Sequence, residues 1–141
     1  MTTSAETQDA MALADRNRAI AIRLMEALDK ADVDTIRSIL SPDVDWYVSG
    51  VGTLDLETLI TQLQGMLGMA KVAQTAIVAT TAEGERVAVE SRGNFEFDDG
   101  RIYRNHYHHL FVVRDDRVVG VREYLDLRET ERVFGPMEAV S

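Results

Sequence analysis

The sequence predicts an α+β fold, in which a strongly curved antiparallel (mixed) sheet wraps around N-terminal helices as a cone-shaped barrel with one pocket. Two patterns predict it. Through about residue 70, apolar residues recur three or four positions apart, as in amphipathic helices. Beyond that point they alternate with polar residues, as in half-buried strands. Helices followed by a meander of strands imply that the helices pack on one face of the sheet.

Three helices are expected in the first half of the chain. The first runs from about residue 9 to Lys30, whose charge suits a helix C-terminus. Asp32 is a candidate N-cap for a short second helix that Pro42 ends. Residues 43–50 form a short strand, and Asp55 is a candidate N-cap for the third helix.

Four alternating segments follow, and short turn sequences separate them. Asp99-Gly100 is a strong hairpin signal, and Glu83-Gly84 and Asp115-Asp116 mark the other two turns. We therefore expect one domain over residues 9–130, a disordered N-terminal tail over 1–8 and a C-terminal tail over 131–141. The four predicted strands lie within QTAIVATTAE, ERVAVESRGNFEF, RIYRNHYHHLFVV and RVVGVREYLDL.

Composition narrows the range of functions. The net charge of -9 argues against a nucleic-acid partner, because the phosphates would repel the protein. No apolar run approaches the roughly 20 residues of a membrane helix, so no membrane partner is expected. The N-terminus lacks a signal-peptide pattern, and a cytoplasmic location is expected. The chain has no cysteine, which removes thiolate nucleophiles and thiolate metal sites.

Turn geometry predicts which side chains meet across the strands. A two-residue loop at Asp99-Gly100 puts Glu90 opposite His109 and Arg92 opposite Tyr107. At the next turn, a two-residue loop would put His109 opposite Arg122, whereas a three-residue loop with a bulge puts it opposite Glu123. We favour the second register, because it joins the aromatic face of one strand to the apolar row of the next.

Glu123 is the most unusual residue of this apolar row. A buried carboxylate costs on the order of several kcal/mol unless it is paired, hydrogen-bonded or protonated. Burial raises the pKa of such a group and a neighbouring cation lowers it, which suits a general acid or base. His109 is the natural proton partner. The alternatives are a structural salt bridge from Glu123 to Arg92 or Arg122, and a histidine that only fills the core.

The remaining candidates surround this pair. Glu90 and Arg92 would tune it, and Tyr107 and Asn105 would orient a substrate oxygen; the alternative for the last two is hydrogen bonding within the sheet. Trp46 and Tyr47 alternate, so one of them is expected to enter the pocket. The expected ligand contacts are Trp46, Val48, Val121, Leu125, Tyr107 and Asn105.

The sequence leaves open which side chains of the strand at 87–97 point toward the pocket. Its apolar members, such as Val89 and Phe95, alternate with polar ones, such as Glu90 and Arg92. Either the apolar set faces inward and the charges face solvent, or the charges line the pocket. In the second case the apolar set would cover the convex face of the sheet and bury it against a second subunit.

The cluster HYHH at 106–109 invites a metal interpretation. Adjacent strand residues point to opposite faces, so His108 and His109 cannot share an ion. We expect His106 and His108 on the opposite face from His109, as interface or surface residues. No metal and no cofactor are expected.

The order of elements resembles the nuclear transport factor two-like superfamily, and more narrowly its SnoaL-like and ketosteroid isomerase-like branch. The segments VAVESRG (87–93) and NHYHHLFVVRDDRVVGVREYLDLRE (105–129), with Gly100 and Tyr103, carry this resemblance over nearly the whole chain. It implies a cone-shaped α+β barrel, usually a homodimer, with a largely apolar pocket and no obligatory cofactor. It does not specify the reaction, because one fold hosts many activities.

The segment VREYLDLRE is also similar to the closing strand of limonene epoxide hydrolase. An aspartate there, at the position of Glu123, belongs to an Asp–Arg–Asp group whose other members would fall near Glu90 and Arg92. The tyrosine and asparagine of that enzyme's water site are Trp46 and Val48 here, and the general base of ketosteroid isomerases also falls near Val48. Valine cannot move a proton, so neither activity carries over as it stands.

Two hypotheses follow for function. In the first, the protein is an enzyme that performs cofactor-free proton transfer on a small, mostly apolar or polycyclic molecule with a carbonyl, hydroxyl or epoxide. Isomerisation, cyclisation, dehydration and water addition all fit this description. In the second, the same pocket or sheet face binds a ligand or protein without chemistry. A pocket filled by its own side chains would favour the second.

Overall fold

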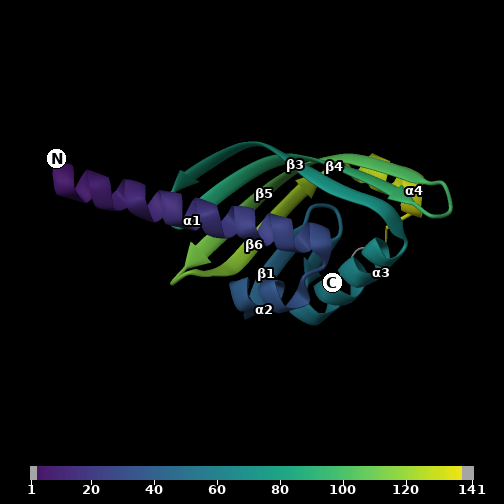
Figure 1. Ribbon diagram of the computed structural model, residues 1–141, viewed down its shortest axis with the longest axis horizontal. Coiled ribbons are helices and arrows are strands. Elements are labelled where there is room, and N and C mark those ends of the chain that lie inside the picture. The colour runs from purple at the N-terminus through teal and green to yellow at the C-terminus, as the bar shows by residue number, and fades with distance from the viewer. Residues whose placement is uncertain (1–2, 138–141) are drawn as a thin grey trace.

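The fold is α+β, as the sequence predicts, with a strongly curved six-stranded mixed sheet that holds the helices on its concave side (Figure 1). The computed structural model describes residues 3–137. The strands lie in the order β2-β1-β6-β5-β4-β3, and all neighbours are antiparallel except β1 and β6, which are parallel. The elements along the chain are α1 (Ser4–Lys30), α2 (Val33–Ile39), β1 (Leu40–Val48), β2 (Gly52–Leu54), α3 (Leu56–Gly68), β3 (Ala70–Glu83), β4 (Arg86–Phe97), β5 (Ile102–Arg114), β6 (Arg117–Leu125) and α4 (Leu127–Phe134).

The helix caps predicted from sequence are confirmed. The carboxylates of Asp32 and Asp55 accept hydrogen bonds from the backbone N–H of Thr35 and Thr58, at 3.3 and 2.8 Å. Helix α1 begins at Ser4, so residues 4–8 are helical where the sequence predicts a tail; residues 1–2 lie outside the described range. Its first turns extend beyond the end of the sheet (Figure 1). Within residues 3–137, no helix has the length and apolar character to cross a membrane.

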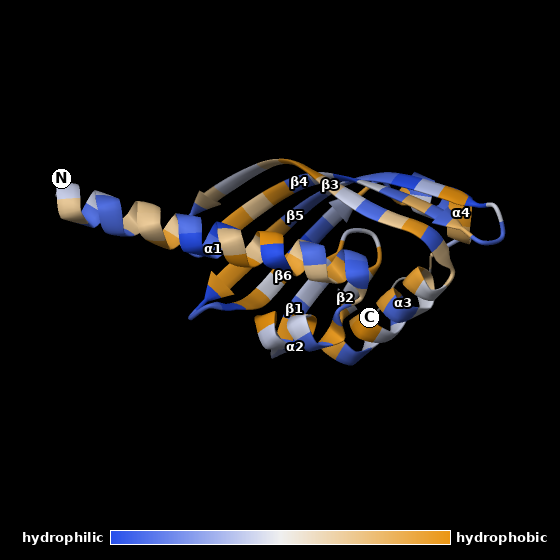
Figure 2. Cartoon of the chain, in the orientation of Figure 1, coloured by the Kyte–Doolittle hydropathy of each residue, from blue (hydrophilic) through white to orange (hydrophobic). Residues whose placement is uncertain are grey.

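Strand β4 turns its apolar set inward. Val87, Val89 and Phe97 are fully buried and Phe95 nearly so, while the charged residues between them lie on the outer face. The bands of hydrophobic and hydrophilic residues along the strands are visible in Figure 2. The sequence left two alternatives for this strand, and the one with apolar side chains inward and charges toward solvent is confirmed.

The hairpin between β4 and β5 differs by one residue from the predicted register. The N–H of Phe97 donates to the carbonyl of Arg101 at 2.9 Å, so the loop contains three residues, 98–100. Gly100 takes the left-handed conformation with φ 92°, as a three-residue loop of this kind requires. Val89, not Glu90, therefore lies opposite His109. A shift of one residue moves every side chain to the other face.

The register between β5 and β6 is confirmed, although its origin differs from the prediction. His109 lies opposite Glu123 and Phe111 opposite Val121. The loop has two residues, Asp115 and Asp116, both with positive φ (51° and 63°), as in a type I′ turn. An extra residue at Val119 then shifts the pairing by one, so a bulge inside β6 replaces the predicted third loop residue.

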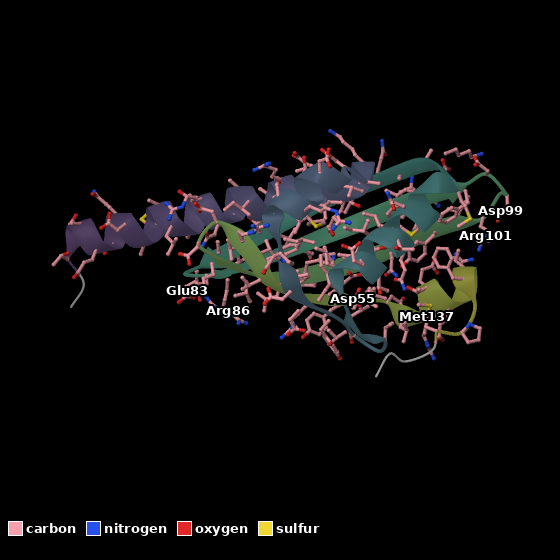
Figure 3. All side chains as sticks on the ribbon, turned by 90° about the horizontal axis from the view of Figure 1, so that it is seen from below. Asp55, Glu83, Arg86, Asp99, Arg101 and Met137 are labelled. Atoms are coloured by element: carbon pink, nitrogen blue, oxygen red, sulfur yellow. The ribbon has the colours of Figure 1, made fainter. Side chains whose placement is uncertain are left out.

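Helix α4, which follows β6, packs against the sheet. Phe134 of α4 packs edge-on against Phe97 and Tyr103, with ring centroids 5.6 and 5.0 Å apart. Helix α4 therefore continues past residue 130, where the sequence predicts the domain to end; residues 138–141 of the predicted tail lie outside the described range. Figure 3 shows Asp99 and Arg101 at the α4 end of the molecule, and Glu83 and Arg86 far from them, on the side from which the first turns of α1 extend.

Candidate active site

A pocket of about 490 Å³ lies between the concave face of the sheet and the helices. Its wall is largely apolar, and no lysine or arginine among residues 3–137 lines it. Trp46, Val48, Tyr107 and Leu125 line it as the sequence predicts, together with His109 and Glu123. The polar side chains in its wall are Asp29, Gln62, Thr75, Tyr103, Tyr107, His109, Glu123 and Thr130, with the Trp46 indole N–H as a further donor.

Glu123 accepts two contacts at a single carboxylate oxygen. The indole Nε1 of Trp46 donates to Oε1 at 3.0 Å, and Nε2 of His109 lies 3.4 Å from the same atom. The side chains of His109 and Glu123 are 8% and 17% exposed. Two sheet pairings produce this group, because β5 places His109 beside Glu123 and the parallel neighbour β1 brings Trp46 to the same face.

The protonation of Glu123 reflects a balance of opposing effects. Burial by itself raises the pKa of the carboxyl, but the hydrogen bond and charge of His109 and the N–H of Trp46 outweigh it, so the pKa is lowered. Glu123 is therefore a carboxylate at neutral pH and is suited to accept a proton or a hydrogen bond.

This lowered pKa predicts how stability depends on pH. Between the folded pKa and the ordinary value of 4.5, the unfolded chain binds more protons, so stability rises with pH. The stabilisation from the Glu123 contacts is thus fully present above about pH 4.5 and is lost as the pH falls through the folded value. Urea unfolding of wild type and Glu123→Gln at pH 7 and pH 3 measures it. The advantage of wild type should shrink at pH 3; a constant or growing advantage contradicts the assignment.

The ring of His109 is held between two aromatic rings. It stacks on Tyr107 and Phe111 at centroid distances of 5.7 and 5.5 Å, and Trp46 contacts it edge-on at 6.2 Å. Its Nδ1 is buried and has no hydrogen-bond partner within residues 3–137, whereas Nε2 faces Glu123. An N–H on Nδ1 would be buried without an acceptor, whereas an N–H on Nε2 points at the carboxylate of Glu123. The neutral form of the ring therefore carries its proton on Nε2.

Tyr107 forms part of the pocket wall because Gly93 has no side chain. Burial raises the pKa of the Tyr107 phenol, and the neighbouring Tyr103 and Glu123 raise it further, so its hydroxyl stays protonated and can donate. A Cβ at Gly93 would lie 2.8 Å from the rings of both Tyr107 and Phe95. The glycine thus leaves room for these two rings.

Gly93→Ala is expected to reduce the free energy of unfolding by about 1–3 kcal/mol, because both rings must move in a packed wall. Gly68→Ala is the matched control, since a Cβ at that helical position meets no atom within 4 Å. The control should be neutral or stabilising by about 0.5–1 kcal/mol. Urea unfolding measures both variants, and an equal effect in the two would contradict the close packing over Gly93.

Asn105 does not line the pocket, and its hydrogen-bonding capacity is used within the fold. Its Nδ2 lies 2.8 Å from the Tyr103 hydroxyl, 3.0 Å from the Asp126 carbonyl and 3.1 Å from the Thr130 hydroxyl. Its Oδ1 accepts from the backbone N–H of His106 and of Asp126, at 2.7 and 3.0 Å. The alternative of orienting hydrogen bonds within the sheet therefore describes Asn105. Val121 is likewise fully buried in the core and outside the pocket wall.

Glu90 and Arg92 lie on the outer face of the sheet, away from His109 and Glu123. Both are exposed, and their register partners are His108 and His106 respectively. The prediction that they stand beside the acid and imidazole is wrong, because the three-residue loop at 98–100 reverses their facing. His106 and His108 are exposed on this outer face, opposite His109, as predicted.

Asp29 and Thr75 are pocket residues that the sequence patterns do not single out. Asp29 lies near the end of α1, and its carboxylate accepts two hydrogen bonds from Thr75 of β3. One signal was available, because Asp29 falls four residues after the buried Met25 and so shares the inward face of the helix. An acid on an apolar helix face is the same kind of anomaly as Glu123 in its strand.

Comparison with family profiles decides the relationship. The profile of the SnoaL-like domain matches residues 21–121, which span most of the chain. The chain belongs to the SnoaL-like domain family. Comparison of this SnoaL-like sequence with curated proteins finds no match.

Solved structures share the fold of this SnoaL-like protein at low sequence identity. A putative SnoaL-like polyketide cyclase from Jannaschia sp. CCS1 is 18% identical, with a TM-score of 0.76 over 87% of this chain and 94% of that one. An LEH-like epoxide hydrolase from M. tuberculosis is 20% identical, with a TM-score of 0.73 over 84% and 89%. AclR, a putative hydroxylase from Streptomyces galilaeus, is 19% identical, with a TM-score of 0.73 over 85% and 95%. These likenesses establish the nuclear transport factor two-like fold.

Proposed function

We propose that this SnoaL-like protein is a cofactor-free acid/base enzyme acting on a small hydrophobic molecule with a carbonyl, hydroxyl or epoxide. The observation that carries the proposal is the carboxylate of Glu123, held by Trp46 and His109 in the wall of a largely apolar pocket. Perturbed ionisable groups inside a pocket are typical of active sites. The names of the similar structures, a polyketide cyclase and an epoxide hydrolase, support this class of chemistry.

Each side chain has a role in this proposal. Glu123 accepts a proton from carbon or from water and later returns it to the reacting molecule, and the Nε2–H of His109 beside the carboxylate stabilises its charge. Only Oε1 of Glu123 is engaged by the side chains of residues 3–137, which leaves Oε2 to face the reactants. The protonated hydroxyl of Tyr107 donates to the substrate oxygen on which negative charge develops.

Proton exchange with solvent tests the proposal without a known substrate. 2-Tetralone, 2-decalone and styrene oxide are incubated with the protein in D₂O, and NMR follows deuterium entry next to the carbonyl or diol formation from the epoxide. Exchange or hydrolysis above the rate in buffer, abolished in Glu123→Gln, is the expected result. If none of the three probes reacts faster with protein than in buffer, the proposal fails for these two reaction types.

A binding module without chemistry is the second candidate, and one observation favours it. Val48 lies opposite Glu123 in the sheet and lines the pocket at the place where the resemblance to ketosteroid isomerases puts their base. The pocket of about 490 Å³ is not filled by its own side chains, so both candidates require a ligand. Ligand binding without deuterium exchange would favour this candidate.

We also propose that the outer, convex face of the sheet pairs with a second copy of the chain, as the family resemblance implies. This face carries the exposed cross-strand pair Glu90 and His108, with Tyr124 beside it at 47% exposure. Sedimentation of the purified chain tests the pairing, which predicts a mass twice that of the monomer.

A further inference from the structure

A second acidic group lies in the pocket wall, on a different element from Glu123. Asp29 of α1 accepts the backbone N–H of Thr75 at 2.8 Å on Oδ2 and the Thr75 hydroxyl at 2.6 Å on Oδ1. Both residues line the pocket. Because a carboxylate has about four lone-pair sites, each oxygen keeps capacity for a further donor.

The surroundings of Asp29 do not neutralise its charge. Its neighbours on the same helix face, Met25 and Leu28, are apolar and line the pocket with it. Burial raises the pKa of Asp29, and the two hydrogen bonds from Thr75 oppose the rise without cancelling it. No lysine or arginine of the described chain lines the pocket. In the unligated protein, the carboxylate charge of Asp29 therefore lies on an apolar wall with the two hydrogen bonds from Thr75 but without a lysine or arginine of the described chain in the pocket wall.

We infer that Asp29 is a second polar anchor of this pocket, which accepts a hydrogen bond from a hydroxyl or ammonium group of the ligand. The pocket then selects uncharged or cationic apolar molecules and rejects anionic ones. The inference deepens the proposed function by naming a substrate class for the same pocket, but it concerns binding and does not require turnover.

The charges in the wall favour this class of ligand. Among the lining residues that the structure describes, Asp29 and Glu123 are acidic and only His109 is basic. An anion brought into this space meets repulsion that a low-dielectric wall screens poorly. A cation gains from Asp29 and from the aromatic side chains that line the pocket, among them Trp46 and Tyr107.

Three cage compounds of one size test the inference: 1-adamantanemethanol, 1-adamantanemethylamine and 1-adamantanecarboxylate. They share a saturated core and differ in one polar group, which is neutral, cationic or anionic at pH 7. Trp46 is the only tryptophan of the chain and lines the pocket, so its fluorescence reports occupancy. The alcohol and the amine should bind at least tenfold more tightly than the carboxylate.

Two variants assign the selectivity to Asp29. Asp29→Asn keeps an acceptor for Thr75 and should lower the preference for amine over carboxylate at least tenfold. Glu26→Gln removes the same charge from an exposed position of the same helix and should leave the preference unchanged. Thermal unfolding confirms that both variants are folded.

Three results would overturn the inference: carboxylate binding as tight as that of the amine, an equal change in both variants, or no binding of any of the cages. None of these depends on catalysis. Loss of turnover in Glu123→Gln, together with unchanged charge selectivity in Asp29→Asn, would leave the proposed function intact and remove Asp29 as an anchor. If wild type shows the charge selectivity and Asp29→Asn loses it, but no assay detects turnover, Asp29 stays an anchor and the proposed enzymatic function fails.

Discussion

Replacing Glu123 by glutamine is expected to lower turnover by about 10²–10⁴-fold, the contribution typical of a positioned acid or base. The amide has the same shape and still accepts the indole N–H of Trp46, which lies 3.0 Å from Oε1. It cannot take up a proton at neutral pH. The expected result is therefore a loss of rate in a variant that still folds and whose ligand affinity changes little.

The matched control is Glu90→Gln, which makes the same chemical change on the outer face of the same sheet. Its turnover should equal that of wild type. Initial rates of deuterium exchange on the probe that wild type converts fastest give the comparison, and Trp46 fluorescence gives the affinities. Unchanged turnover in Glu123→Gln, or an equal loss in Glu90→Gln, would remove Glu123 from the chemistry.

Replacing Asn105 by alanine is expected to cost about 3 kcal/mol of the free energy of unfolding. The side chain is 1% exposed and joins β5 to the start of α4 through the backbone of Asp126 and the hydroxyls of Tyr103 and Thr130. Its removal leaves several buried donors and acceptors without partners, and each such group costs about 1–3 kcal/mol if it stays dry. Partial relaxation and water entry keep the total below their sum.

Asn94→Ala is the control for this change. Asn94 lies on the other face of the sheet, where its Oδ1 accepts one side-chain hydrogen bond within the described part of the chain, from Nε of Arg104 at 3.0 Å. Substitutions at such positions usually change stability by about 0.5 kcal/mol or less. Urea unfolding of the two variants measures the difference, and similar costs would show that the Asn105 network contributes nothing beyond an ordinary surface contact.

The two hairpins show why register was predictable at one turn and not at the other. For β5 and β6, one register joined two apolar faces and the alternative did not, so burial decided between them, and His109 met Glu123 as predicted. For β4 and β5, Asp99-Gly100 fits both a two-residue and a three-residue loop. The glycine adopts φ 92° in the longer one, and the facing of Glu90 and Arg92 follows from that single residue.

The candidate site was predictable to the extent that it lies in one hairpin. His109, Tyr107, Glu123 and Leu125 belong to neighbouring strands and were found from alternation and from the match between two apolar faces. Asp29 was not predicted as a pocket residue, because the sequence of its helix does not show that Thr75 of β3 lies opposite it. The Trp46 contact to Glu123 arises from the parallel pairing of β1 with β6, 77 positions apart in the chain.

The sequence by itself determined the fold class, the caps of the second and third helices and the pairing of an imidazole with a carboxylate in an apolar row. Periodicity and turn chemistry act over a few residues and can be read locally. The tertiary structure alone decided which faces of the strands and helices enclose the pocket. It also decided that Trp46 donates to Glu123 and that α1 contributes Asp29 to the pocket wall. These depend on the docking of distant segments, whose contact free energies exist only once the sheet has curved around the helices.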